Sequence, residues 1–339
     1  MTLGVAILGS GIFAREEHLP AVNASKDLEL KAVYSRSLKS AQSLGTDAGS
    51  VDLYSDDSGA DKSLDDLLRR DDIHAVIVAL PIKNQPDYIR KALLAGKHVL
   101  SEKPVAENVK DAKELIEWYE KEIQPKGTTW GVAENVRFWP GVVFVGEARQ
   151  KQGKALTFRA RMQTLVEGGK YFETDWRKVP THQGGFLLDG GVHFAAALRL
   201  LLGNNDPLVS LVAYTAQLQE HLPPVDTIEA IARAKSGAVG TISISFGTTA
   251  QGSEYHVGSE GGFVSASRTQ FIVDKEVKEF KQDSGVTPEV AAWGEGLRDG
   301  KPNPLQRPQE ALADLEIIEA CLRSGEQGGK SIELKYQEV

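Results

Sequence analysis

The sequence has 339 residues, of which 41% are hydrophobic and 25% charged, and its formal net charge is −8 at pH 7. This is the composition of an ordinary globular protein, and the length suffices for two domains. The acidic balance argues against nucleic acid or an anionic membrane surface as a partner. With Cys321 as its one cysteine, the chain forms no intrachain disulfide and no cysteine-based zinc site.

The expected location is the cytoplasm. A strand pattern begins at Thr2 and leaves no room for a targeting peptide. No apolar run approaches the roughly 20 residues that a membrane-spanning helix needs.

The chain opens with an apolar run from Thr2 to Leu8, which continues directly into a G-x-G-x-x-A pattern and then a helical pattern. In this strand–turn–helix context the pattern predicts dinucleotide binding, with a merely structural turn as the alternative. The first glycine allows a tight turn, the second lets a pyrophosphate approach the backbone, and Ala14 lets the helix pack on the strand. The predicted cofactor-binding residues of this loop are Gly9, Gly11, Ile12 and Phe13.

Strands and helices then alternate as far as residue 134. The predicted strands are 28–34, 51–54, 75–80, 98–100 and 128–133, and the predicted helices are one that starts at Ser63, 87–95 and 109–123. Such alternation is typical of a doubly wound parallel sheet, so residues 1–134 are predicted to form a Rossmann-type dinucleotide-binding domain.

Beyond residue 134, strands follow strands. The predicted strands are 156–164, 209–219, 227–234 and 239–248 with a hairpin at 263–273, and the predicted helices are 138–150, 189–202 and 304–322. Residues 135–339 are therefore predicted to form an α+β domain with a largely antiparallel open sheet. No flexible linker marks the boundary, and ligands usually bind between such domains.

The loop after the second strand indicates which nucleotide binds. A cofactor with a free ribose 2′-hydroxyl normally meets an acid here, but no acid occurs between Leu30 and Asp47. Cations and hydroxyls that suit a 2′-phosphate stand there instead: Ser35, Arg36, Ser37 and Lys39. This favours NADP(H) over NAD(H), and a solvated basic loop is the alternative.

Further candidate residues follow the next strands. Leu80 ends the strand 75–80 and Pro81 and Asn84 follow it, and Glu102 and Lys103 come after the strand 98–100. In open α/β sheets ligands bind at this edge. Glu102 is predicted to orient backbone near the nicotinamide, and Pro104 fixes the chain after Lys103. A lysine at a strand end can also be merely solvated.

Asp189 and His193 open the helix predicted in the second domain. Their i, i+4 spacing puts both side chains on one helix face, where a carboxylate can orient an imidazole that exchanges protons near neutral pH. The alternative is an N-cap aspartate beside a half-buried histidine. The other histidines are scattered, no third ligand completes a zinc site, and no motif for covalent catalysis is present.

Three motifs together resemble the glucose–fructose oxidoreductase, inositol dehydrogenase and MocA (Gfo/Idh/MocA) family. They are the glycine loop of residues 9–14, Glu102-Lys103-Pro104, and Gly184-Gly185 followed by Asp189 and Gly191-Val192-His193. The resemblance spans nearly the whole chain and includes Asn135-Val136-Arg137-Phe138. The stretch 174–177 is more similar to a eukaryotic cytosolic branch of NADPH-linked members.

The resemblance implies roles for single residues. Lys103 would hydrogen-bond the reacting oxygen, His193 would exchange its proton, and Asp189 would bind a neighbouring hydroxyl, with Arg177 and Asn135 as further substrate-binding residues. The chain departs from the family at two places: Ala196 stands where an acid is frequent, and Asn84-Gln85 stand where a histidine is frequent. Both departures concern the substrate.

The leading hypothesis is an NADP(H)-dependent oxidoreductase that interconverts a secondary alcohol and a carbonyl, on a sugar, polyol or related small carbonyl compound. One alternative is a non-catalytic NADP-binding sensor or regulator. Another is an enzyme whose tightly held NADP cycles between two sugars. The resemblance also implies a homo-oligomer formed through the C-terminal sheet.

Overall fold

The structure is a computed structural model that describes residues 2–48, 51–281 and 283–338, with the backbone alone for residues 45–48. The chain divides into two compact units, unit 1 (Met1–Glu134 and Ser284–Pro308) and unit 2 (Asn135–Asp283 and Gln309–Val339). The division after residue 134 lies where the composition of elements changes in the sequence. Residues 284–308 belong to unit 1, whereas the sequence pattern assigns them to the second domain.

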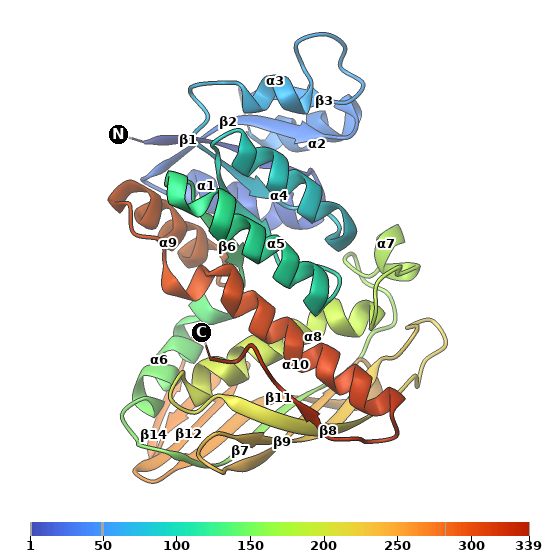
Figure 1. Ribbon diagram of the computed structural model, residues 1–339, viewed down its shortest axis with the longest axis vertical. Helices are drawn as coiled ribbons and strands as arrows, with labels where there is room; N and C mark the ends of the chain where they lie inside the picture. Colours follow the sequence, from blue (N-terminus) through green and yellow to red (C-terminus); the bar gives the residue numbers. More distant parts are fainter. Residues whose placement is uncertain (1, 49–50, 282, 339) are drawn as a thin grey trace. The chain divides into compact units, whose positions relative to one another are not determined.

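Unit 1 contains a six-stranded parallel sheet in the order β3-β2-β1-β4-β5-β6 (Figure 1). Its strands are β1 (Leu3–Leu8), β2 (Leu28–Ser35), β3 (Asp52–Ser55), β4 (Ala75–Val78), β5 (His98–Glu102) and β6 (Trp130–Ala133). The predicted doubly wound sheet is confirmed. The strand β4 is wholly apolar and fully buried because helices cover both faces of the sheet.

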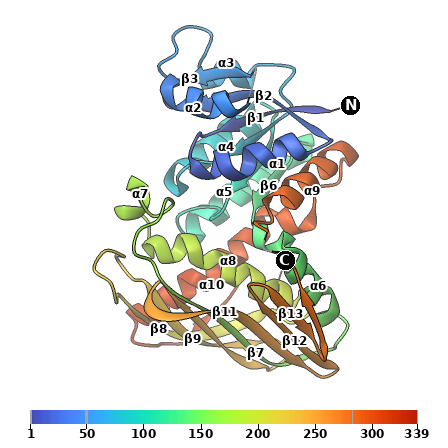
Figure 2. The ribbon, with the colours of Figure 1, turned by 180° about the vertical axis from the view of Figure 1, so that it is seen from behind.

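The helices of unit 1 connect successive strands. They are η1 (Ala14–His18), α1 (Leu19–Ala24), α2 (Leu38–Ala48), α3 (Leu64–Leu68), η2 (Ile82–Asn84), α4 (Gln85–Leu94), α5 (Val109–Glu122) and η3 (Gln124–Lys126). At the start of α3, Ser63 and Asp66 form a reciprocal capping box, as the predicted N-cap requires. The helix α1 lies on one face of the sheet, and α4 and α5 lie on the other (Figures 1 and 2).

A helix that the sequence pattern does not predict, α9 (Val286–Asp299), completes unit 1 together with the short η5 (Pro304–Gln306). Val286, Val290 and Trp293 recur at helical spacing and are buried in one core cluster with β1 and α1. The spacing of these apolar residues is a helical signal in the sequence, but the neighbouring glycines and Pro288, which disfavour a helix, weaken it. Burial of the stripe against the sheet is the physical reason why the segment belongs to unit 1.

Unit 2 contains a nine-stranded sheet in the order β14-β13-β12-β11-β7-β10-β9-β8-β15. The strands are β7 (Ala155–Leu165), β8 (Leu208–Ala216), β9 (Thr227–Ala234), β10 (Val239–Ser245), β11 (Gly247–Ser259), β12 (Gly262–Ser267), β13 (Gln270–Val273), β14 (Glu276–Glu279) and β15 (Ile332–Glu333). The sheet is antiparallel apart from the parallel pair β7 and β10, so the predicted class is confirmed.

The strand predicted at 239–248 is in fact two strands, since β10 ends at Ser245 and β11 begins at Gly247. Between them the Phe246 amide donates to the Asp226 carbonyl at 2.9 Å. A Cβ on Gly247 would lie 2.5 Å from the Asp226 carboxylate, so the chain passes close to this aspartate.

The helices of unit 2 are η4 (Asn135–Phe138), α6 (Pro140–Arg149), α7 (Asp175–Lys178), α8 (Gly185–Leu202) and α10 (Pro308–Glu326). Prolines at the first position of α6 and α10 set their starts, which is why the predicted helices 138–150 and 304–322 begin later than expected. The helices α6, α8 and α10 lie on one face of the sheet (Figures 1 and 2).

The helix α8 is more apolar than the sequence pattern indicates. Among the described residues it is the one helix long and apolar enough to cross a membrane, with a mean hydropathy of 1.4 over 18 residues. Of this stretch, 67% is buried inside the protein, as in the central helix of a folded domain.

Cys321 on α10 is fully buried, and burial raises the pKa of its thiol to about 12. The cysteine is therefore a core residue, as predicted.

Candidate functional site

The predicted nucleotide-binding residues of unit 1 follow the carboxyl ends of four strands of one parallel sheet. The loops concerned are residues 9–13 after β1, 35–39 after β2, 80–84 after β4 and 102–103 after β5. The chain leaves β1 toward β2 on one side and returns to β4 on the other. This reversal of direction is the place where open α/β sheets bind nucleotides.

The glycine loop leaves space for a phosphate. Gly9 has a φ of +114°, and a Cβ there would lie 2.2 Å from the Ala79 carbonyl, so the turn itself requires glycine. A Cβ on Gly11, by contrast, would meet no heavy atom within 4 Å. Helical residues begin directly afterwards at position 12, as in helices whose N-termini bind phosphate groups. Ala14 is 1% exposed, which allows the close packing predicted for it.

The loop after β2 is anchored by its serines. Ser35 Oγ lies 3.0 Å from Ser10 Oγ in the glycine loop, and Ser37 Oγ accepts from the Ser40 amide at the start of α2. Arg36 and Lys39 are exposed. Arg36 thus lies on the loop next to the glycine turn, and Lys39 lies in the first turn of α2.

An acid from the next strand reaches this loop. Asp57 follows β3, and its Oδ1 accepts from the Leu38 amide at 2.6 Å and from the Ser55 hydroxyl at 2.6 Å. These two hydrogen bonds hold the pKa of the Asp57 carboxyl below its usual value, with the Ser55 bond the larger cause. The sequence pattern does not indicate this acid, because Asp57 follows β3 and not β2, where an acid that binds the ribose is expected.

The loop after β4 positions Leu80, Pro81 and Asn84 at the same edge. Leu80 packs toward Gly9, since its Cδ2 lies 3.2 Å from a Cβ built on that glycine. Asn84 is exposed, whereas Gln85 is 1% exposed. In the described part of the chain, no group forms a hydrogen bond with the buried side-chain amide of Gln85. This residue stands at one of the two departures from the family pattern.

At the end of β5, Glu102 and Lys103 are half-buried, and the bond between Lys103 and Pro104 is cis. Glu102 Oε1 lies 2.7 Å from Nε2 of His18, which is fully buried. The sequence pattern leaves His18 among the scattered histidines, and no local signal connects it with a residue 84 positions away. At the other end of β5, His98 Nδ1 bonds the Thr129 hydroxyl and amide, as a packing residue does.

In unit 2 the structure brings Asp189 and Arg177 together. Arg177 Nε donates to Asp189 Oδ2 at 2.7 Å, and its guanidinium lies 4.0 Å from the centre of the Trp176 ring. Asp189 is 4% exposed, and the positive charge of Arg177 compensates its buried carboxylate. The N-cap alternative for Asp189 is wrong, because α8 begins four residues earlier at Gly185.

His193 stands one turn after Asp189 on the same face of α8 and is half-buried. A Cβ on Gly185, before them, would lie 2.2 Å from the Pro223 carbonyl, which explains the close backbone approach predicted for the glycine pair. Asn135 begins η4 and is half-buried. Lys103 and the glycine loop belong to unit 1, whereas Asn135, Arg177, Asp189 and His193 belong to unit 2.

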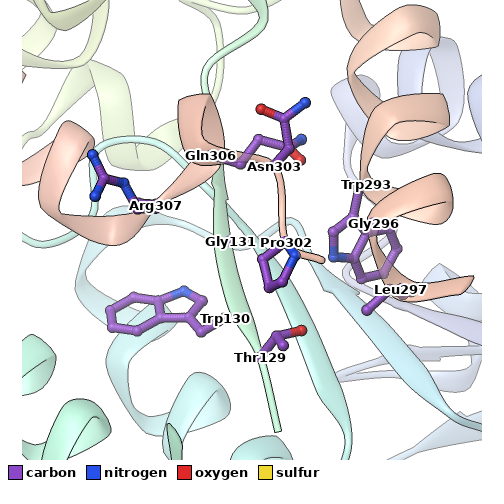
Figure 3. A pocket seen from close by; sticks show the side chains of 10 residues that line it. All are labelled: Thr129, Trp130, Gly131, Trp293, Gly296, Leu297, Pro302, Asn303, Gln306 and Arg307. Carbon is purple, nitrogen blue, oxygen red and sulfur yellow. The ribbon is translucent and has the colours of Figure 1, made fainter. Parts of the chain in front are cut away.

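A surface pocket in unit 1 holds none of the predicted site residues (Figure 3). It is lined by Thr129, Trp130, Gly131, Trp293, Gly296, Leu297, Pro302, Asn303, Gln306 and Arg307. Trp130 and Gly131 form the amino-terminal half of β6 and Thr129 precedes it, whereas the candidate cofactor residues lie at the carboxyl ends of strands. Within the described ranges, no group of three or more His, Cys, Asp or Glu residues could hold a metal ion.

Comparison with protein families decides the assignment. The model of the oxidoreductase family with an NAD-binding Rossmann fold (Gfo/Idh/MocA) matches residues 3–124. The model of its C-terminal α/β domain matches residues 153–334. The chain belongs to the Gfo/Idh/MocA family. The resemblance stated from the three motifs is confirmed.

Individual Gfo/Idh/MocA relatives cover the chain almost completely. A dehydrogenase, FPY6, of Fusarium mangiferae is 42% identical over 351 aligned residues, with 99% of this chain and 100% of the relative covered. A D-xylose 1-dehydrogenase (NADP(+)) of Haloferax volcanii is 25% identical, with coverage of 95% and 97%.

Solved structures agree. An oxidoreductase from Thermotoga maritima has a TM-score of 0.87 at 32% identity, with coverage of 98% of this chain and 99% of that one. The protein is therefore an NAD(P)-binding oxidoreductase.

Proposed function

We propose that this Gfo/Idh/MocA protein is an NADP(H)-dependent oxidoreductase that interconverts a secondary alcohol and a carbonyl on a sugar, polyol or related small carbonyl compound. One observation carries the proposal: a glycine loop with open space at Gly11 stands at the same sheet edge as Lys103. The second domain adds an acid–base candidate, His193, one helical turn from the charge-compensated Asp189.

The preference for NADP(H) rests on charge. Arg36 and Lys39 offer two cations to a 2′-phosphate, whereas the carboxylates after β3 are engaged within the protein: Asp56 Oδ1 accepts from the Tyr34 hydroxyl, and Asp57 Oδ1 accepts from Leu38 and Ser55. The NADP(+)-linked xylose dehydrogenase among the relatives supports this preference. The second candidate is NAD(H), which Asp57 favours if its Oδ2 accepts from a ribose hydroxyl.

A bound nicotinamide would supply or receive the hydride, and the chain's own residues would handle the oxygen and its proton. The positive charge of Lys103 stabilises the developing alkoxide, and the imidazole of His193 takes or gives the proton. Asp189 accepts from a neighbouring substrate hydroxyl while Arg177 compensates its charge. Asn135 provides a further polar contact to the substrate.

The test is a screen for loss of NADPH absorbance with sugars and with aliphatic or aromatic carbonyls of similar size. Lys103→Met, with NADPH and the same panel, is the matched control for contaminating activity. Polyhydroxylated carbonyls are expected to react faster, because a site that hydrogen-bonds hydroxyls rejects analogues without them. A preference for unsubstituted carbonyls would contradict the substrate class.

Binding of NADPH without turnover of any compound would favour a non-catalytic sensor or regulator. Retention of nucleotide through purification, with its oxidation by one sugar and re-reduction by another, would favour a cofactor that cycles between two sugars. An aldose–aldose oxidoreductase from Caulobacter crescentus shares the fold, with a TM-score of 0.83 at 20% identity.

We also propose a cytoplasmic location, from the absence of any cysteine besides Cys321. Fractionation of cells that express the full-length protein is the direct test.

A further inference from the structure

A buried histidine in the helical segment after β1 contacts the end of β5, and these two strands are not neighbours in the sheet of unit 1. His18 is the last residue of η1, the helical segment that follows the glycine loop after β1. Its Nε2 lies 2.7 Å from Oε1 of Glu102, the last residue of β5. Because β4 lies between β1 and β5, this hydrogen bond reaches past the end of β4.

Within the described residues, the imidazole ring of His18 has one hydrogen-bond partner. His18 is 0% exposed, and Phe13 of the glycine loop packs edge-on against it with ring centres 5.3 Å apart. Within the described residues, Nδ1 has no hydrogen-bond partner, so the ring's polar contact is with Glu102. A carboxylate that is ionised only accepts, and in that state of Glu102 the His18 Nε2–H is the donor of this bond.

We propose that His18 is a positioning residue of the active site, which fixes Glu102 and thereby the adjoining Lys103 relative to the glycine loop. The inference rests on the proposed function, in which Lys103 acts on the substrate oxygen. His18 itself contacts neither substrate nor reacting atoms in this role. A displacement of about 1 Å in a reacting geometry can cost about 100-fold in rate.

Two variants separate the hydrogen bond from the volume of the ring. His18→Leu fills the space without a donor, whereas His18→Gln retains an N–H that can reach Glu102. His18→Leu is expected to lower kcat by about 10- to 100-fold. Its NADPH dissociation constant is expected to stay within a few-fold of wild type, and the isotope effect with 4-deuterated NADPH to rise as hydride transfer becomes limiting. His18→Gln is expected to regain most of kcat.

His98→Leu is the matched control, since His98 is a half-buried, hydrogen-bonded histidine at the opposite end of the same strand. It is expected to leave kcat and the isotope effect unchanged. Adding His18→Leu to Glu102→Leu should lower kcat no further, because a residue that acts through another shows a non-additive effect. Additive losses would overturn the inference.

Hydrogen exchange of residues 102–110 tests the same bond without any turnover. The exchange rate in this segment should rise in His18→Leu and remain at the wild-type level in His18→Gln and His98→Leu. Unchanged exchange in His18→Leu would overturn the positioning role. If the wild-type protein reduces no carbonyl, while the three variants still show this pattern of exchange, the proposed function is rejected. The His18–Glu102 contact is then still established. If His18→Leu does not fold, Glu102→Leu removes the same bond and must give the same exchange result.

Discussion

Two glycines in one loop are required for different physical reasons. At Gly9 the backbone conformation and the nearby Ala79 carbonyl exclude any side chain, so the folded chain itself demands glycine. At Gly11 the protein leaves open space, and no contact in the described chain explains the residue. The space at Gly11 fits the approach of a pyrophosphate to the backbone.

Arg36 carries the prediction on cofactor choice. Arg36→Ala is expected to weaken NADPH binding by about 1.5–3 kcal/mol, the range for hydrogen bonds to charged groups, while NADH binding hardly changes. The measurement is titration of nucleotide fluorescence. Arg69→Ala, at another exposed arginine of unit 1, is the control and should alter neither affinity. Equal weakening of both nucleotides by Arg36→Ala would reject the assignment.

Lys103 and His193 carry the prediction on chemistry. Lys103→Met and His193→Ala are each expected to lower kcat by about 10²- to 10⁴-fold, because each removes a group that acts on the reacting oxygen or its proton. NADPH affinity should stay within a few-fold of wild type, since neither residue is assigned to the adenosine or pyrophosphate. The experiment combines steady-state rates with cofactor titration, and near-normal turnover of Lys103→Met would refute this mechanism.

Among the elements of unit 2, a buried ionic network holds α10 to α8 and η4. Asp314 of α10 accepts from Arg199 of α8 at 2.9 Å and also from Arg137 of η4. Arg199 makes a second ion pair with Glu310 at 2.9 Å. All four side chains are at most 9% exposed, so each charge depends on its partners for compensation.

Asp314→Ala is therefore expected to destabilise unit 2 by about 3–5 kcal/mol, the cost of leaving a buried charge without its partner. Urea unfolding followed by circular dichroism measures the change. Glu326→Ala, at an exposed position of the same helix, should shift the transition little. A loss for Asp314→Ala as small as that of the control would show that the network contributes nothing to stability.

At the scale of the whole molecule, the sheet of unit 2 carries the proposed oligomer contact. Its face opposite the helices presents exposed apolar side chains on four strands: Tyr214, Ile231, Val239 and Phe263. We expect a homodimer through this face, since exposed apolar groups gain free energy when a partner covers them. Light scattering after gel filtration should give twice the mass of the chain, and Ile231→Asp should give the monomer. A wild-type monomer at micromolar concentration would contradict the expectation.

Short-range patterns in the sequence by themselves determined the class of both domains, the glycine loop, and the candidate residues Lys103, Asp189 and His193. They could do so because strand and helix periodicity, and the composition of turns, depend on residues a few positions apart. The boundary after residue 134 was readable for the same reason, as the alternation of strands and helices stops there.

Only the tertiary structure decided which distant residues meet. It assigned α9 to unit 1 and brought Asp57, after β3, into contact with the first amide of α2. It also joined His18 to Glu102. None of these contacts has a local signal, because hydrogen bonds and buried apolar contacts between distant residues depend on strand order, and strand order is not written in any single segment. The structure also starts α8 at Gly185, with Gly184 as an N-cap that makes no side-chain hydrogen bond, so Asp189 lies inside the helix and not at its end.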